Sequence, residues 1–327
     1  MDKSMHKESC IFVAGHRGLV GSAICRRLTA EGFTNLLVRT HAELDLCDAR
    51  AVNSFFGKER PEYVFLAAAK VGGILANSSY PADFLRENLA IELNVIDSAW
   101  RHGVKKLQFM GSSCIYPKDA EQPIREEYLL SGPLEPTNEW YAIAKIAGIK
   151  LAQAYRKQYG FSAICLMPTN LYGPHDNFDL QTSHVLPALI RKFHEAKHLG
   201  APEVVVWGSG TPRREFLHVD DLANATVYLM HHYDDGMPLN VGVGTDITIS
   251  DLAALIGKTV GYEGKIVWDG TKPDGTPRKL LDVSRLNVLG WTAGIHLEQG
   301  IASTYEWFVN SSWVEEGAIS MATHQSA

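Results

Sequence analysis

The sequence predicts an α/β protein with a doubly wound parallel sheet and a smaller C-terminal lobe. Three observations carry this prediction: a glycine-rich turn after the first apolar run, apolar runs that alternate with helical patterns, and shorter elements separated by turns after Pro168. Buried strands separated by helices favour right-handed crossovers and a parallel sheet. We therefore expect a first domain over residues 10–167, a lobe mainly over 168–310 with segments returning to the first domain, and flexible ends at 1–9 and 311–327.

The composition of the 327 residues is that of a globular protein, with 46% hydrophobic and 21% charged residues. A net charge of −6 and an isoelectric point near 6.1 leave no general basic surface, so we expect no nucleic-acid partner. The five scattered cysteines disfavour a disulfide framework or a metal site and suit the reducing cytoplasm. No apolar run approaches the roughly 18 to 20 residues that span a membrane, so a soluble protein is expected.

The first element is a short apolar strand, predicted over residues 10–14. Gly15, Gly18 and Gly21 then form a turn that leads into a helix over 22–30. Glycines at this spacing let the backbone approach a pyrophosphate, whose charge lies at the helix N-terminus. A glycine triple is weak alone, and an ordinary turn is the alternative, but its place between a strand and a helix is the context that a dinucleotide-binding (Rossmann) motif requires.

The second strand, predicted over 36–39, ends at Arg39, where a fold that prefers NAD carries an acidic residue for the ribose 2′-hydroxyl. Together with Arg17 in the glycine turn, Arg39 could hold a 2′-phosphate through planar contacts. We therefore expect NADPH/NADP rather than NADH, with two solvated surface arginines as the alternative. Asp45 is a candidate contact for the adenine end of the cofactor.

The following elements repeat the alternation of strand and helix. Strands are predicted over 63–66, 107–110 and 163–166, and long helices over 83–102 and 140–159. Because these strands are almost entirely apolar, we expect them to be buried in one parallel sheet. Ligands of such sheets bind at the carboxyl ends of the strands, which is where the candidate residues lie.

Ser112, Tyr141 and Lys145 form the most informative constellation in the chain. Tyr141 and Lys145 are four residues apart, so on a helix they share a face, where the ammonium can favour the phenolate. An isolated tyrosine titrates near ~10, and each unit by which the lysine lowers this pKa is worth roughly 1.4 kcal/mol. The alternative is a packed tyrosine beside a solvated lysine. With the glycine turn upstream, the three residues point to hydride transfer from a nicotinamide to a ketone.

The texture of the sequence changes after Pro168, where Gly-Pro, Gly-Ser-Gly and Asp-Gly segments separate shorter elements. The clearest of these elements are a helix over 185–197, a strand over 204–207 and a helix over 249–260. No linker separates the two parts of the chain. We therefore expect the chain to cross between them more than once.

Together these residues resemble the extended short-chain dehydrogenase/reductase family of nucleotide-sugar enzymes, over about residues 10–310. The motifs that carry the likeness are Gly-His-Arg-Gly-Leu-Val-Gly at 15–21, Gly-Ser-Ser-Cys-Ile-Tyr-Pro at 111–117, the pair Tyr141 and Lys145, Pro-Thr-Asn-Leu-Tyr-Gly-Pro at 168–174 and Arg-Glu-Phe-Leu-His-Val-Asp-Asp at 214–221. Segments 175–178, 183–185 and 272–279 are similar to the branch of the family that acts with NADPH on a GDP-linked 4-keto-6-deoxymannose.

Cys114 is the position that separates the branches of this family. In the sugar-nucleotide dehydratases the residue matching Ser112 is followed by an Asp-Glu pair, and the 4-epimerases carry neither this pair nor a cysteine. A free cysteine is usually a small buried hydrophobic residue. The resemblance implies instead that Cys114 is the base and His184 the acid that invert C3 and C5 of the sugar, although His184 alone could be an ordinary loop histidine. Ser112, Tyr141 and Lys145 would then serve the reduction of C4.

The resemblance also implies the residues that hold the ligands. The expected cofactor contacts are Gly15, His16, Arg17, Gly18, Leu19, Val20, Gly21, Arg39, Asp45, Lys145, Pro168, Asn170, Leu171 and His184. The expected contacts of the GDP end of the substrate are Lys192, Trp207, Arg214, Asp274 and Arg278, with Arg191 as an alternative to Lys192 and a solvated charge or core aromatic as the alternative for each.

A homodimer through the helices at 83–102 and 140–159 is implied as well. Two other functions stay open at this point. One is a related nucleotide-sugar epimerase that uses tightly bound NAD, and the other is a non-catalytic NADP-sensing protein of the same fold.

Overall fold

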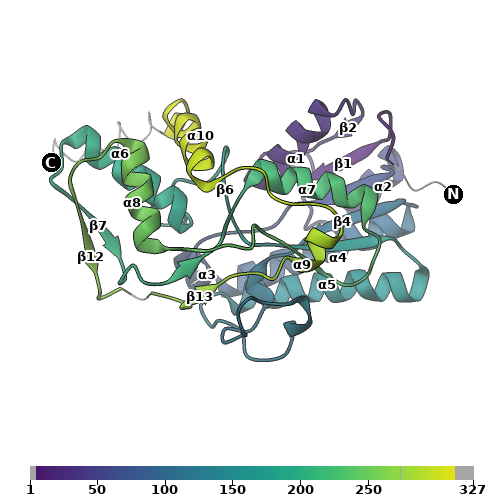
Figure 1. Cartoon of the computed structure of the whole chain (residues 1–327). Helices are drawn as coiled ribbons and strands as arrows, with labels where there is room; N and C mark the ends of the chain where they lie inside the picture. Colours follow the sequence, from purple (N-terminus) through teal and green to yellow (C-terminus); the bar gives the residue numbers. More distant parts are fainter. Residues whose placement is uncertain (1–4, 273, 314–327) are drawn as a thin grey trace.

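The structure, a computed structural model, describes residues 5–272 and 274–313 (Figure 1). Its centre is a parallel six-stranded sheet in the order β10-β5-β4-β3-β1-β2. The strands are β1 (Ile11–Ala14), β2 (Leu36–Leu37), β3 (Tyr63–Leu66), β4 (Lys106–Met110), β5 (Ala163–Pro168) and β10 (Leu239–Val241). All residues of β1, β3, β4 and β5 are buried, as expected for strands covered on both faces. The predicted doubly wound parallel sheet is confirmed.

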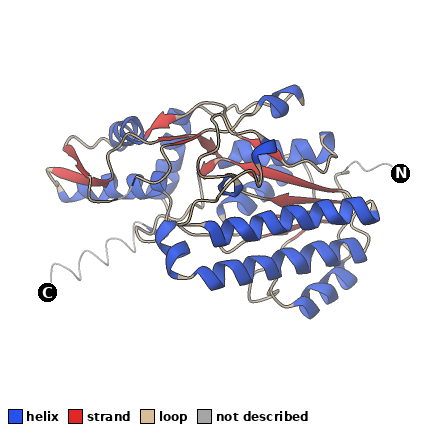
Figure 2. Cartoon of the chain, turned by 90° about the horizontal axis from the view of Figure 1, so that it is seen from below, coloured by secondary structure: helices blue, strands red, loops and turns tan. Residues whose placement is uncertain are grey.

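Helices cover both faces of this sheet (Figure 1). On one face α1 (Leu19–Ala30) packs against α7 (Val219–His232), and on the other α4 (Pro81–Arg101) packs along α5 (Glu139–Tyr159), with α2 (Ala49–Glu59) beside α4. Figure 2 shows the two long helices side by side. The chain leaves β1 toward β2 and then returns past β1 to β3, so the order of the strands reverses there. Such a switch point is where open α/β sheets bind ligands.

The other lobe has its own hydrophobic cluster. There β7 (Glu203–Trp207) pairs in parallel with β12 (Lys265–Asp269). The helices α6 (Val185–Leu199), α8 (Ile249–Val260) and α10 (Leu297–Val309) pack against these strands and against one another. β7 alternates exposed and buried residues, because only one face of this small sheet is covered.

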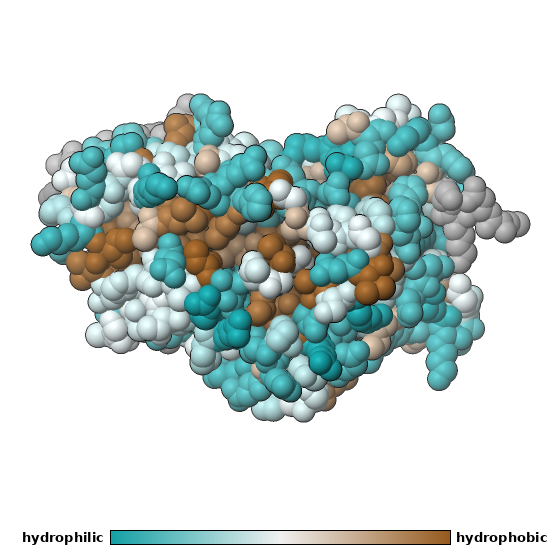
Figure 3. Space-filling model, viewed as in Figure 1, coloured by the Kyte–Doolittle hydropathy of each residue, from teal (hydrophilic) through white to brown (hydrophobic). Residues whose placement is uncertain are grey.

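Short strands join the two parts of the molecule. β6 (Asn170–Tyr172) pairs with β9 (Phe216–His218), and β8 (Arg213–Arg214) lies between β11 (Ile247–Thr248) and β13 (Arg278–Lys279). The remaining helices are the short α3 (Ile74–Ser79) and α9 (Ser284–Val288). On the face seen in Figure 3, hydrophobic residues form a band that runs across the middle of the molecule, from one lobe to the other.

Some boundaries differ from the predicted ones. The strand predicted over 36–39 is limited to β2, because the Arg39 side chain turns to the carbonyl of Val38 and to Glu59 at the sheet edge. α1 begins three residues earlier than predicted, because Gly18 is its N-cap and Gly21 fits inside its first turn. Of the ends expected to be flexible, residues 1–4 and 314–327 lie outside the described residues, whereas Met5 is buried in the core.

Candidate active site

The glycine turn between β1 and α1 forms a cradle that only glycine can build. Gly15 has a φ of +88°, and a Cβ atom there would lie 2.9 Å from the backbone of Ala68, which follows β3. A Cβ atom on Gly21 would lie 2.1 Å from the carbonyl oxygen of Gly15. Gly18 caps α1 without a side-chain hydrogen bond, and no acidic residue lies in the first turn. The free N–H groups of this helix end therefore fit an anion such as a dinucleotide pyrophosphate.

The other cofactor candidates lie around this turn. His16 and Arg17 form its tip, and Leu19 and Val20 begin α1. Arg39 follows β2, and its guanidinium is 2.9 Å from a carboxylate oxygen of Glu59. A 2′-phosphate would have to compete with this ion pair. The remaining candidates are exposed Asp45, which accepts a hydrogen bond from the Cys47 N–H, and Pro168, Asn170 and Leu171, which lie where β5 ends and β6 begins.

Ser112 and Cys114 lie just beyond the carboxyl end of β4. Gly111 follows this strand and packs against the end of the Met167 side chain on β5, to which a Cβ atom on Gly111 would come within 2.4 Å. The Ser112 hydroxyl then accepts a hydrogen bond from the Cys114 N–H at 3.3 Å and begins a short 3₁₀ turn over Ser113–Ile115. In this turn Cys114 is buried at the edge of the main hydrophobic cluster, where it also lines a cavity.

Tyr141 and Lys145 lie on the first turns of α5, which packs against the 3₁₀ turn. The Lys145 ammonium is 5.8 Å from the centre of the Tyr141 ring. Burial raises the pKa of Tyr141 well above its ordinary value, and Cys114 and Glu92 act in the same direction. The sequence led us to expect that Lys145 lowers this pKa. In the structure, burial outweighs any such effect, and Tyr141 is a protonated phenol at neutral pH.

Glu92 on α4 is the partner of Lys145. A carboxylate oxygen of Glu92 lies 3.3 Å from the ammonium, and each side chain is only 2% exposed. Gly148, one turn after Lys145, makes this approach possible, since a Cβ atom there would lie 2.7 Å from Glu92. Burial raises the pKa of Glu92 to about 7, although Lys145 opposes the shift. The ion pair fixes the position of the Lys145 side chain and directs its ammonium group toward Glu92.

The cavity in front of Cys114 is lined by residues from three parts of the chain. They are Ser113, Cys114, Tyr116, Pro117, Lys118, Gln122, Ile124, Glu135, Asn138, Thr276, Arg278 and Lys279. His184, the N-cap of α6, is reached by solvent but has protein on most sides, and burial lowers its pKa. The positive charge of Lys279 acts on both Cys114 and His184, lowering the pKa of each. Both residues thus lie within electrostatic reach of the Lys279 ammonium.

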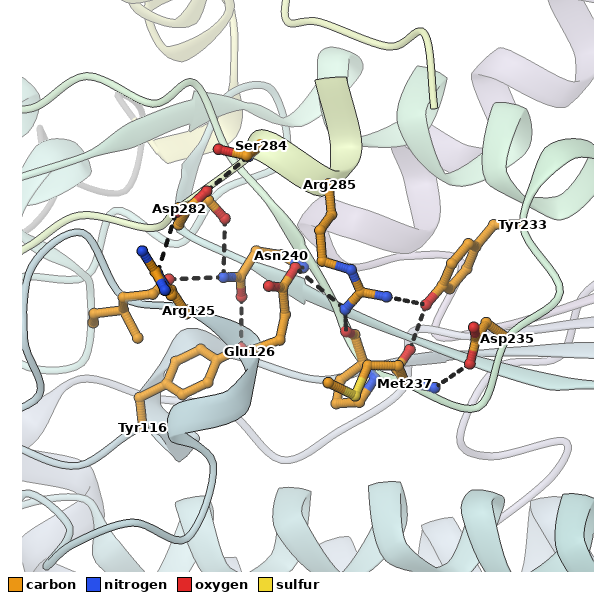
Figure 4. A network of polar contacts seen from close by, with 12 residues as sticks. Tyr116, Arg125, Glu126, Tyr233, Asp235, Met237, Asn240, Asp282, Ser284 and Arg285 are labelled. Atoms are coloured by element: carbon orange, nitrogen blue, oxygen red, sulfur yellow. Dashed lines mark hydrogen bonds and ion pairs between the residues drawn. The ribbon is translucent and has the colours of Figure 1, made fainter. Parts of the chain in front are cut away.

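A polar network centred on Asn240 anchors the loop 117–138 behind this cavity (Figure 4). The Tyr116 hydroxyl donates to the Asn240 side-chain oxygen at 2.6 Å. The Asn240 amide donates to the carbonyl oxygens of Ile124 at 2.9 Å and Asp282 at 3.1 Å. The network therefore joins the segment after β4 to β10 and to the segment after β13, and it fixes two walls of the cavity relative to each other.

Trp207 and Lys192 form an exposed platform in the second lobe. Trp207 is the last residue of β7. Its side chain is 57% exposed, which is unusual for a side chain of this size. The ammonium groups of Lys192 and Lys272 lie 5.4 Å and 5.3 Å from its ring. Arg191, the alternative to Lys192, is instead paired with Glu195 at 2.7 Å. An aromatic face flanked by two cations is suited to a nucleobase carrying phosphates.

The last substrate candidates lie in two groups. Arg214 on β8 faces the loop of Asp274, whose carboxylate accepts hydrogen bonds from the Ser209 N–H and hydroxyl, both at 2.7 Å. Arg278 on β13 lines the cavity but is held by Asp246, which also binds Arg213. The Arg214 guanidinium donates a hydrogen bond to the Arg213 carbonyl at 2.8 Å, whereas the charge of Arg278 is neutralised by Asp246.

Comparison with known proteins places this geometry in a family. A model of the NAD dependent epimerase/dehydratase family matches residues 11–242. The chain belongs to this family. The relative named GDP-L-fucose synthase 1 of Arabidopsis thaliana is 63% identical over 305 residues, which cover 93% of this chain and 94% of that protein. The GDP-L-fucose synthase of Escherichia coli strain K12 is 58% identical over 310 residues, covering 92% and 97%.

A solved structure extends the likeness to the fold. The crystal structure of a GDP-L-fucose synthetase from Naegleria fowleri bound to NADP is 31% identical, with a TM-score of 0.87, and the match covers 94% of this chain and 96% of that one. Within the part of the chain that the structure describes, no cluster of three or more histidine, cysteine or acidic side chains is arranged to bind a metal. Nor does any described helix have the length and apolar character needed to cross a membrane.

The sequence reasoning missed two residues of this site, Glu92 and Lys279. Glu92 lies four residues from Asn88 and from Ile96, which are both buried, so it is a carboxylate on the apolar face of a helix. Such a position predicts a buried partner. Lys279 ends the segment 272–279, and the sequence of that segment does not indicate that it lines the same cavity as Cys114. This proximity depends on the pairing of β13 with β8.

Proposed function

We propose that the protein is an NADPH-dependent epimerase and reductase that converts GDP-4-keto-6-deoxy-D-mannose into GDP-L-fucose. The observation that carries the proposal is Cys114, placed two residues after Ser112 and beside Tyr141 at the end of β4, in a family whose close relatives are named GDP-L-fucose synthases. A nucleotide-sugar epimerase with tightly bound NAD is not favoured, because neither the cysteine nor these relatives support it. A non-catalytic sensor would not need Tyr141 and Lys145.

Epimerisation uses the C4 ketone as an electron sink. Cys114 removes the proton from C3 or C5, the electrons move onto the C4 oxygen as an enolate, and the Ser112 hydroxyl donates a hydrogen bond to that oxygen. His184 returns a proton to the opposite face of the carbon. Burial and Lys279 lower the pKa of His184, so the imidazolium that delivers this proton forms more readily as the pH falls.

Reduction uses the same ketone as an electrophile. NADPH, held by the residues of the glycine turn, would supply the hydride. Tyr141, kept protonated by burial, donates its hydroxyl proton to the C4 oxygen, and Ser112 again binds that oxygen. Lys145, which is paired with Glu92, would bind the nicotinamide ribose.

Binding of GDP is expected to raise the melting temperature of the protein much more than binding of UDP. At a concentration 100 times its dissociation constant, a ligand stabilises the folded state by about 2.7 kcal/mol. Stacking on the larger purine and contacts with Lys192 and Arg214 favour GDP, and Trp207→Ala should reduce the shift. Differential scanning fluorimetry with GDP, ADP and UDP checks this, and equal shifts for GDP and UDP would contradict the guanosine site.

Replacement of Arg39 by glutamate is expected to lower the preference for NADPH over NADH. Loss of a charge-assisted phosphate contact costs roughly 1.5 to 3 kcal/mol, or about ten- to 150-fold in relative kcat/KM. The measurement is kcat/KM for both cofactors, with Arg50→Glu on the exposed start of α2 as the charge-matched control. An unchanged ratio in Arg39→Glu would show that another residue selects the 2′-phosphate.

We also infer a cytoplasmic homodimer that pairs through α4 and α5. On these helices Leu89, Leu93, Trp140 and Ile143 are exposed although they are large and apolar, which favours a protein partner. Light scattering on the wild type should give the mass of two chains, and Leu93→Glu should give one. The five free thiols suit a reducing compartment.

A further inference from the structure

Lys279 presents a positive charge to the cavity that holds Cys114. The two side chains line the same cavity. The other cations of its wall are engaged within the protein: Lys118 is 3.3 Å from Glu135, and Arg278 is paired with Asp246. In contrast, within residues 5–272 and 274–313 the Lys279 ammonium makes no hydrogen bond or ion pair.

The backbone around Lys279 is fixed from both sides. In β13, Lys279 is in register with Arg214 of β8, and its carbonyl accepts the Glu215 N–H at 3.3 Å. The next residue, Leu280, donates its N–H to the Gln122 side chain at 2.8 Å and accepts the Ile124 N–H at 2.8 Å. Position 279 is thus held between β8 and the loop that follows Cys114, so the ammonium does not depend on an exposed, mobile segment.

The charges around Cys114 and Lys279 come from several elements. Burial raises the pKa of Cys114. Three groups lower it: Lys279 has the largest effect, followed by the hydrogen bond with Ser112 and by Lys145 on α5. Burial also lowers the pKa of Lys279, while Cys114 opposes that shift. Among the other charged neighbours of Lys279, Arg214 lowers its pKa further and Glu135 raises it. Two further titratable groups belong to this site: Tyr141, whose pKa is raised by burial and by Cys114, and His184, whose pKa is lowered by burial and by Lys279.

We propose that the Lys279 ammonium favours the thiolate form of Cys114 and thereby raises the rate of proton abstraction from the sugar. This inference rests on the proposed function, because it takes Cys114 as the base. A thiol buried without a cation would ionise only at alkaline pH and would leave the enzyme without a base at neutral pH. Lys279 acts through Cys114, so it is a positioning residue that tunes the base.

The experiment compares Lys279→Met with Lys279→Arg and with the matched control Lys118→Met, whose lysine lines the same cavity but is already neutralised by Glu135. The Cys114 thiolate is titrated by its ultraviolet absorbance, with Cys114→Ala subtracted, in protein without substrate. Lys279→Met should shift the titration upward by about one pH unit, which is about ten-fold in thiolate at neutral pH. Lys279→Arg and Lys118→Met should titrate like the wild type.

A second readout is deuterium incorporation at C3 and C5 of the keto sugar, followed by NMR. In Lys279→Met it should fall about ten-fold at neutral pH and recover at higher pH, where the thiol ionises without help. An unchanged thiol titration in folded Lys279→Met would overturn the inference. If the wild type incorporates no deuterium, the proposed function fails, while the thiol titration still decides whether Lys279 acts on Cys114. Should Lys279→Met not fold, Lys279→Gln takes its place against Lys279→Arg.

Discussion

Tyr141→Phe is expected to lower the rate of NADPH oxidation by about 10²- to 10⁴-fold and to leave deuterium incorporation at C3 and C5 intact. Reduction of C4 needs a proton on its oxygen, and the Tyr141 hydroxyl is the acid placed to supply it. Enolate formation needs only a base and a hydrogen-bond donor, which are Cys114 and Ser112. The two rates are measured side by side, by absorbance for NADPH and by NMR for the sugar in deuterated buffer.

Tyr155→Phe is the matched control for this variant. Tyr155 lies on the same helix and its hydroxyl donates to Asp97 at 2.7 Å, so its replacement also removes one hydrogen bond from α5. We expect this change to cost about 1 kcal/mol of stability and to leave both rates near the wild-type values. If Tyr141→Phe loses proton exchange together with NADPH oxidation while it remains folded, Tyr141 has a part in both steps.

The parts of this site that the sequence predicts are those that local geometry decides. The glycine turn lies between adjacent elements; Gly21 is required by a contact inside the turn and Gly15 by its positive φ and by the backbone that follows β3. Tyr141 and Lys145 share a helix face because of their spacing. The alternation of apolar runs with helical patterns is enough to predict the parallel sheet and therefore the edge at which the site forms.

The parts that the sequence does not predict depend on contacts between distant segments. The pairing of Lys145 with Glu92 requires that α4 and α5 lie side by side, and Gly148 sets how closely they approach. The direction of the Tyr141 pKa shift is likewise set by burial, which spacing along a helix cannot reveal. Arg39 is a further case, since its pairing with Glu59 on α2 follows from the packing of that helix at the sheet edge.

These distant contacts also distribute the positive charges around Cys114. Lys145 is paired with Glu92, and the ammonium group that acts most strongly on Cys114 is that of Lys279 on β13. Under the proposed function, Tyr141 would serve as the neutral acid of the reduction. Cys114 would be the base of the epimerisation, and the ammonium group that acts on it most strongly belongs to another segment of the chain.

Cys114→Ala is expected to abolish deuterium incorporation at C3 and C5, because it removes the base and nothing else in the cavity has the same position. The loss of an acid–base group lowers such a rate by about 10²- to 10⁴-fold. Since burial raises the pKa of the thiol, wild-type exchange should increase with pH as the thiolate forms, whereas the exchange that remains in Cys114→Ala should not follow this titration. NMR of the sugar over a range of pH measures both.

Cys165→Ala provides the control for the loss of a buried thiol. Cys165 is 2% exposed in β5 and is not part of the cavity wall, so its removal weakens the core without touching the chemistry. Exchange should therefore persist in Cys165→Ala and be lost in Cys114→Ala, even if both proteins melt at a lower temperature. Undiminished exchange in folded Cys114→Ala would remove the thiol from the mechanism, and with it the role of Lys279, while the reduction by Tyr141 would be unaffected.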